Sequence, residues 1–153
     1  MPHAVAFRLD ADARGRQLKG FNSRVEIIWF AFQGSFEAPG TAEIRFAHTI
    51  PGMLGGGGTG AVNGGVIAAG FDAALVLAGL GHYETDVVVT LDLSVQFLAL
   101  ARPGPGLVFR AHVTRSARHF AFVQAELVDG DRTLATAKGM VAPQATPAAR
   151  NAS

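Results

Sequence analysis

A single stretch of the chain, residues 61–80, most constrains its fold. The stretch is rich in Ala, Val, Leu and Gly and has no regularly spaced polar positions, which predicts a helix that is buried on most of its sides. Twenty residues of helix are roughly 30 Å long, enough to cross a small sheet. The carboxylate of Asp72 and several glycines interrupt the longest apolar run, so a membrane span is not expected.

The pattern changes from helical to alternating after this helix. Between residues 87 and 98 apolar side chains alternate with polar ones such as Thr90. This period of two predicts a half-buried strand with Thr90 on its polar face. Two strands are expected before the helix, at 25–32 and 41–48, and three more after this one, at 107–116, 120–128 and 133–141.

These elements define the expected fold class. Short connections after the helix favour antiparallel pairing over parallel crossovers. We therefore expect an α+β fold in which a mostly antiparallel sheet wraps one long buried helix. Residues 1–22 are expected to form an arm or a short helix, residues 23–142 a single domain, and residues 143–153 a flexible tail.

Composition excludes several classes of protein. The chain has 153 residues, of which 16% are charged and 49% hydrophobic, a balance unlike that of disordered chains. The net charge of +1 and the lack of a basic run argue against a nucleic-acid partner. There is no cysteine for a disulfide or a thiolate metal site, and the five histidines show no i, i+4 pair. We expect no metal, no membrane association and a cytoplasmic location.

A glycine-rich tract precedes the predicted helix. Gly55, Gly57 and Gly60 match G-x-G-x-x-G between a predicted strand and a predicted helix, as in dinucleotide-binding sites. Such sites require repeated strand–helix–strand crossovers, and no further helix fits between the later strands. A flexible loop is the better interpretation.

A second candidate site lies at the start of the helix. Asn63, Gly64 and Gly65 would expose backbone N–H groups at a helix N-terminus, where a carbonyl oxygen that gains negative charge is stabilised. Asp72 follows nine residues after Asn63. A carboxylate in an apolar helix needs a partner or a function; the alternative is that it faces solvent or a hydrogen-bond donor.

These residues resemble the hotdog-fold acyl-CoA thioesterases of the phenylacetate-degradation (PaaI-like) type. That family's motif runs Asn-x-x-Gly-x-x-His-Gly-Gly, with an acidic residue nine positions after the His. Here Asn63 stands at the usual His and Gly57 at the usual Asn, whereas Asp72 matches the acidic residue. Thr90, 18 residues after Asp72, matches a Ser or Thr of the family. The resemblance covers about residues 41–141.

The resemblance implies hydrolysis of a thioester between an acyl group and coenzyme A. Asp72 would be the general base or the nucleophile, and the N–H of Gly65, together with Gly64, would polarise the carbonyl. Asn63 would orient the carbonyl or a water, without proton transfer. Thr90 would position Asp72 or the water; alternatively, it is an ordinary strand threonine.

The resemblance also implies further contacts and partners. Gly57, Gly60 and Arg118 are expected to contact the substrate, and coenzyme A is part of the substrate, so no separate cofactor is expected. In this family the helix start and the strand come from different subunits, which implies a homodimer or a homotetramer (a dimer of dimers). The alternative is a non-catalytic hotdog module that binds acyl-CoA or another small ligand. The missing His and Asn favour this module, and the retained Asp72 and Thr90 oppose it. A hotdog hydratase is less favoured, because no Asp/His pair has that family's spacing.

Overall fold

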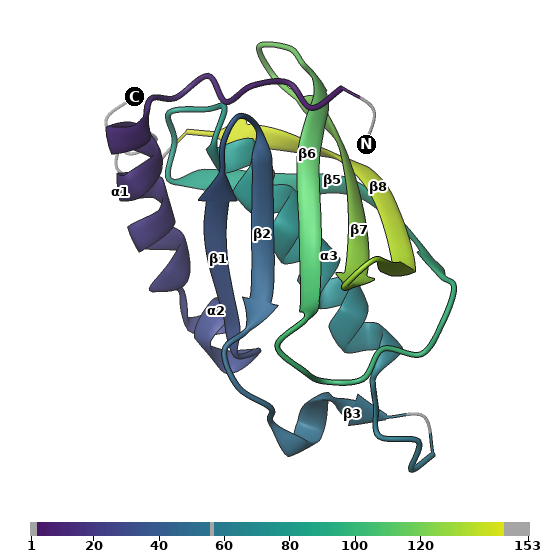
Figure 1. Ribbon diagram of the computed structural model, residues 1–153. Helices are drawn as coiled ribbons and strands as arrows, with labels where there is room; N and C mark the ends of the chain where they lie inside the picture. The colour runs from purple at the N-terminus through teal and green to yellow at the C-terminus, as the bar shows by residue number, and fades with distance from the viewer. Residues whose placement is uncertain (1–2, 56, 146–153) are drawn as a thin grey trace.

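One long helix packs against one face of a curved antiparallel sheet in the computed structural model, which describes residues 3–55 and 57–145 (Figure 1). The long helix α3 (Gly64–Leu80) crosses behind the sheet, and α1 (Ala11–Asn22) lies beside its β1 edge. The six-stranded sheet has the order β1-β2-β6-β7-β8-β5, with every pair antiparallel. This is the expected α+β arrangement.

Strands β2 and β5 to β8 agree closely with the strands expected from the sequence. As expected, the connections after β6 are short: one hairpin joins β6 to β7 and another joins β7 to β8. The strands of the large sheet are β1 (Phe32–Glu37), β2 (Thr41–Phe46), β5 (Val87–Phe97), β6 (Leu107–Ser116), β7 (Ala121–Asp129) and β8 (Arg132–Gln144).

The helix α3 forms the centre of the hydrophobic core. Phe71, Leu75 and Leu77 are fully buried, because the sheet covers most of the helix surface. Gly70 brings the helix against Phe109 of β6, and a Cβ at Gly70 would lie 2.3 Å from that ring. The low polarity of this helix therefore reflects contact with the sheet along most of its length.

The expectation of a strand at residues 25–32 is wrong. Residues Val25–Trp29 form the short helix α2, and β1 begins only at Phe32. The chain reverses between them at Ala31, which has a φ of 58°. The β-branched and aromatic residues of this segment are typical of a buried strand, but several of their side chains are exposed. Trp29, for example, is 70% exposed. Composition alone does not reveal this exposure.

The expected loop at residues 52–60 contains more regular structure than its glycines suggested. A 3-10 turn (Pro51–Met53) leads into β3 (Leu54–Gly55), which pairs with β4 (Ala61–Val62). At the other end of the chain β8 continues through Gln144 and so includes the first two residues of the expected tail. Most of that tail, 146–153, lies outside the described residues.

Strand β5 contains a β-bulge that reverses the expected orientation of Thr90. The register with β8 pairs Thr90 with Val141 and Asp92 with Met140, so Leu91 is an additional residue. Before the bulge Thr90 faces α3; after it Leu93 packs against the core beside α3. The strict alternation in the sequence had placed Thr90 on the polar outer face. That expectation is wrong, because the additional residue at the bulge lets Thr90 and Leu93 face the same side of the sheet.

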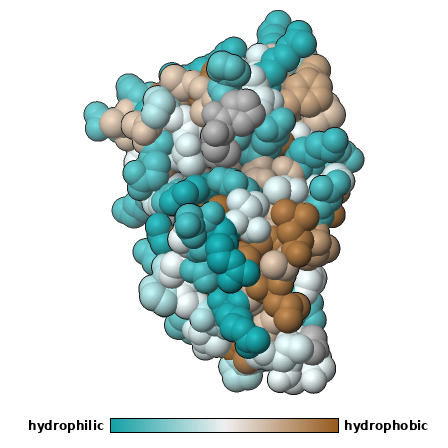
Figure 2. Space-filling view, turned by 45° about the vertical axis from the view of Figure 1, so that its right-hand side comes forward, coloured by the Kyte–Doolittle hydropathy of each residue, from teal (hydrophilic) through white to brown (hydrophobic). Residues whose placement is uncertain are grey.

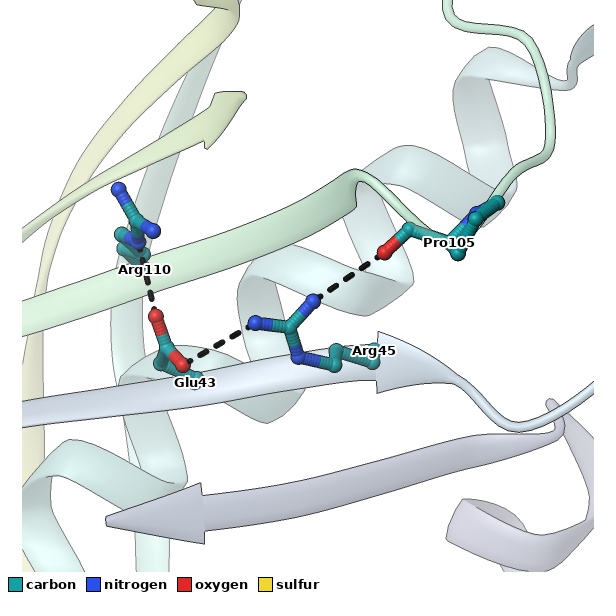
Figure 3. Close-up of polar contacts among 4 residues, drawn as sticks. All are labelled: Glu43, Arg45, Pro105 and Arg110. Atoms are coloured by element: carbon teal, nitrogen blue, oxygen red, sulfur yellow. Dashed lines mark hydrogen bonds and ion pairs between the residues drawn. The ribbon is translucent and has the colours of Figure 1, made fainter. Parts of the chain in front are cut away.

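The face of the sheet opposite α3 carries polar side chains. There Glu43 of β2, only 7% exposed, accepts a hydrogen bond of 2.8 Å from Nε of Arg110 on β6 (Figure 3). Arg45 lies 3.5 Å from the same carboxylate and also donates to the carbonyl of Pro105 (Figure 3). These contacts link β2 to β6 and to the loop before it.

The N-terminal segment lies across the end of the sheet and of α3 (Figure 1). The N–H of Val5 donates to Val113, and the N–H of Leu9 donates to Gly81 just after α3. Beneath this segment His82 is 3% exposed and its ring lies 5.6 Å from that of Phe7. Neither ring nitrogen of His82 has a hydrogen-bond partner within the described part of the chain, so its side chain does not cap α3. Among the described residues, no helix is long and apolar enough to cross a membrane.

Candidate active site

The first candidate group lies at the N-terminus of α3. Asn63 is the N-cap, and its side-chain oxygen accepts a hydrogen bond of 2.7 Å from the N–H of Gly65. Asn, Gly and Gly form this start easily, since Asn is a favoured N-cap and both glycines leave the backbone open. All three residues are exposed. The N–H that the sequence assigned to the substrate is thus paired with Asn63 in this chain.

The second candidate group is a carboxylate–hydroxyl pair. Thr90 of β5 donates a hydrogen bond of 2.5 Å from its hydroxyl to Oδ1 of Asp72 on α3. Asp72 is exposed, so the alternative that it faces solvent and a hydrogen-bond donor describes its surroundings. The pair leaves Oδ2 of Asp72 available to a water or a carbonyl carbon, and fixes the orientation of the carboxylate.

The two groups do not meet within one chain. Asp72 lies seven positions after Gly65 on α3, which is about 10 Å along the helix axis. A single carbonyl group cannot contact both the N–H of Gly65 and the carboxylate of Asp72 of one chain. The geometry therefore requires a second chain to complete a site that uses both.

The glycine tract lies against the helix start. A Cβ at Gly55 would lie 2.9 Å from Nδ2 of Asn63, so only glycine lets β3 pass this close. Gly57 and Gly60 have φ of +63° and +74°, a conformation that favours glycine. Arg102 donates a hydrogen bond of 2.6 Å to the carbonyl of Thr59 and holds the loop in place.

Arg118 lies at the other end of the molecule from Asn63. It follows β6, in the turn whose backbone accepts hydrogen bonds from Tyr83 just after α3, whereas Asn63 precedes the first turn of the same helix. The β6–β7 turn lies at the top of Figure 1 and β3 at the bottom. Within one chain the structure does not bring Arg118 together with the other candidates. In the described part of the chain no three His, Asp or Glu side chains form a metal-binding group.

Two cavities adjoin the two candidate groups. One, of about 450 Å³, opens beside Asn63 and Gly64 and is lined by the apolar segment that ends β5. The other, of about 90 Å³, includes Asp72 and lies between α3 and the N-terminal helices. The sequence did not predict the wall that α2 provides for this second cavity, because residues 25–32 had been assigned to a strand.

Exposed apolar side chains gather where β5 ends. Figure 2 shows apolar side chains concentrated on one part of a face that is otherwise largely hydrophilic. Leu91 and Phe97 of β5 are each 56% exposed, and Leu98 and Leu100 after it are each 60% exposed. Strand β5 is also the edge of the six-stranded sheet. An apolar edge strand of 11 residues is suited to pair with another chain.

The fold is that of a known class of enzyme. A family model of the thioesterase superfamily matches residues 59–136, a range that contains Asn63, Gly65, Asp72 and Thr90. The chain belongs to the thioesterase superfamily, and its activity is accordingly of the thioester-hydrolase type. No curated protein matches the chain in sequence.

Solved structures agree with this assignment at the level of the fold. The PaaI protein of the Escherichia coli phenylacetic acid degradation operon superposes with a TM-score of 0.74 and 16% identity, over 88% of this chain and 95% of that one. A putative thioesterase of Ralstonia eutropha, related to phenylacetic acid degradation, has a TM-score of 0.70 and 24% identity, over 85% and 98%. A Haemophilus influenzae thioesterase has a TM-score of 0.73 and 17% identity, over 90% and 94%. The predicted hotdog fold and the resemblance to PaaI-like thioesterases are confirmed.

Proposed function

We propose that the protein hydrolyses acyl-CoA thioesters, with Asp72 as the residue that acts on the substrate or on water. The observation that supports this most directly is the hydrogen bond between Thr90 and Asp72. It orients an exposed carboxylate on α3, and nothing about the packing of the core requires it.

The reaction needs two contributions from these residues. Asp72 accepts a proton from water as the water oxygen bonds to the thioester carbon, the N–H of Gly65 stabilises the negative oxygen, and the carbon–sulfur bond then breaks. The thiolate of coenzyme A leaves and takes up a proton. In the alternative, Asp72 itself bonds to the carbon, coenzyme A leaves, and water hydrolyses the resulting anhydride.

The hydrogen bond from Gly65 to Asn63 adds a step to this scheme. The carbonyl oxygen must replace the side-chain oxygen of Asn63 as the acceptor from Gly65 or share that N–H with it. Asn63 then retains an amide N–H₂ that donates to the same oxygen. Asn63 would thus close the site when it is empty and bind the carbonyl when it is occupied.

A homodimer would complete the site. The distance along α3 between Gly65 and Asp72 and the apolar edge strand β5 both support an arrangement in which one chain supplies Asp72 and its partner supplies the helix start. A homotetramer made of two such dimers is equally compatible with this site. The tight turns at Gly57 and Gly60 would then border the coenzyme, and Arg118 would contact its phosphates from the partner chain.

Release of the thiol from a panel of acyl-CoA compounds tests the proposal. We expect turnover by the wild-type protein and a loss of kcat of at least about 1,000-fold in Asp72→Asn and Asp72→Ala. Asp86→Asn, at another acidic position just before β5, is a matched control that should retain activity. Full turnover in both Asp72 variants would contradict the role given to Asp72.

A non-catalytic module that binds acyl-CoA is the second candidate. It is favoured by the N-cap contact of Asn63, which occupies the N–H of Gly65, and by the absence of a histidine at position 63. Calorimetric binding of the same compounds without any release of thiol would establish the module in place of the enzyme.

A further inference from the structure

The cavity beside Asp72 has a defined origin in the fold. Ala69, Ala73 and Val76 lie on the same face of α3 as Asp72, and the two alanines leave space above the helix. The opposite wall comes from α1, α2 and the start of β1. The apolar side chains on that wall are Phe21, Ile27, Phe30 and Phe32.

The wall is rigid on two sides. Phe21 and Ile27 are 1% and 4% exposed and belong to the core. Arg24 donates a hydrogen bond of 2.6 Å to the carbonyl of Asp86, and its guanidinium lies 5.6 Å from the ring of Phe21. These contacts tie α2 to α1 and to the segment before β5, so the cavity does not widen on these two sides without breaking them.

We propose that this cavity holds the acyl group and limits it to a substituent of about three to four carbon atoms beyond the carbonyl. The proposal rests on the proposed function, since it places the thioester carbon at Asp72. The cavity measures about 90 Å³. A benzene ring is known to occupy a cavity of about 150 Å³, so the space suits a butyryl or branched valeryl group better than a phenylacetyl group.

The chemistry of the lining supports an apolar acyl chain. Arg24, Glu26 and Asp72 are the polar residues of the lining, and the other seven are apolar. Glu26 is exposed, and Arg24 is already hydrogen-bonded to a carbonyl. Neither side chain is therefore positioned to bind a carboxylate on the acyl group. The bulky coenzyme would occupy the larger cavity, of about 450 Å³, at the helix start of the partner chain.

Substitutions on either side of the cavity test the proposal. We would measure kcat/KM for acetyl-, butyryl-, hexanoyl-, phenylacetyl- and palmitoyl-CoA. The wild-type value should fall at least about tenfold from butyryl to hexanoyl, because each poorly placed methylene changes such ratios by about 10- to 200-fold. Ile27→Ala enlarges the cavity and should raise the hexanoyl to butyryl ratio about tenfold; Ile27→Val gives a smaller rise if the larger change prevents folding.

A matched control and a filling variant separate size from general damage. Ile28→Ala removes the same atoms from the neighbouring, 61% exposed side chain and should leave the ratio unchanged. Ala69→Leu fills the cavity and should lower kcat/KM for butyryl-CoA about tenfold more than for acetyl-CoA. The size limit is overturned if Ile27→Ala and Ile28→Ala have the same ratio of kcat/KM for hexanoyl-CoA to that for butyryl-CoA. It is also overturned if the wild type prefers palmitoyl- or phenylacetyl-CoA. Either result leaves the proposed function intact. Absence of turnover with every compound overturns both.

Discussion

At the scale of single residues, the hydroxyl of Thr90 is the most direct support for the carboxylate of Asp72. The Thr90→Val variant removes this hydrogen bond and keeps the side-chain volume. A hydrogen bond to a charged group contributes about 1.5–3 kcal/mol, so we expect kcat to fall about 10- to 100-fold. KM should change little, because the hydroxyl is hydrogen-bonded to Asp72.

The conservative variant completes this experiment. Thr90→Ser keeps the hydroxyl and should retain most of kcat, whereas a purely structural role for Thr90 would make the two variants alike. Steady-state kinetics on one acyl-CoA substrate distinguish these results. Wild-type kcat in Thr90→Val would show that Asp72 does not depend on this contact.

The buried His82 makes stability depend on pH. Burial, and secondarily the positive charge of Arg8, lower the pKa of His82 from 6.5 to about 4. The unfolded chain therefore binds a proton between these values that the folded chain does not bind, and stability falls as the pH falls through this window. The loss is about 2 kcal/mol between pH 8 and pH 5.

Urea unfolding of variants at pH 8 and pH 5 measures this contribution. His82→Leu should lose about 2 kcal/mol of the pH dependence of the wild type, while His119→Leu, at an exposed histidine, should keep it. An unchanged pH dependence in His82→Leu would place the titrating groups elsewhere.

At the scale of elements, the contact between α3 and the sheet predicts opposite effects for two glycine-to-alanine changes. A Cβ at Gly70 would overlap the ring of Phe109, so Gly70→Ala should cost about 1–3 kcal/mol of unfolding free energy. In α1 a Cβ at Gly15 would meet nothing within 4 Å, so Gly15→Ala should stabilise the protein by up to about 1 kcal/mol. Thermal or urea unfolding gives both values, and equal effects would contradict the close packing described for α3.

The same elements show how far the sequence predicts the molecule. Helix α3 follows from its nearly unbroken apolar composition, and strands β5 to β8 follow from their β-rich and alternating patterns. Helix α2 does not, since a five-residue segment rich in Val, Ile and Trp has the composition of a strand. The bulge at Leu91 could not be predicted from the sequence either, because the apolar and polar residues alternate without a break across it.

The candidate site could be predicted only in part for related reasons. The spacing of Asn63, Asp72 and Thr90 selects them as candidate residues, and the structure brings two of them, Asp72 and Thr90, into contact. It does not show that Asn63 pairs with Gly65, because the cap depends on a side-chain rotamer. The cavity beside Asp72 was missed because its outer wall is α2.

At the scale of the whole molecule, a site shared between two chains predicts complementation between inactive variants. Asp72→Asn and Gly65→Pro would each inactivate both sites of a homodimer. The proline removes the N–H and is compatible with the first turn of a helix. In a mixed dimer one site carries both changes and the other carries neither.

Mixing after reversible dissociation tests this expectation. Equal amounts of the two variants should recover about one quarter of wild-type activity, since half of the dimers are mixed and each has one intact site. Two preparations of the Asp72→Asn variant mixed with each other serve as the control. No recovery in a mixture shown to contain heterodimers would mean that each chain uses its own helix start.

The position of Gly65 and Asp72 on one uninterrupted helix has a consequence for how this protein can change over evolutionary time. In the proposed dimer, the number of residues between them sets the distance between the two sites. One inserted or deleted residue would turn Asp72 by about 100° around the helix and shift it by about 1.5 Å, away from Thr90. Substitutions between these positions are tolerable wherever they fit, but the number of residues is fixed. Homologues that keep the activity should therefore vary in sequence here and not in length.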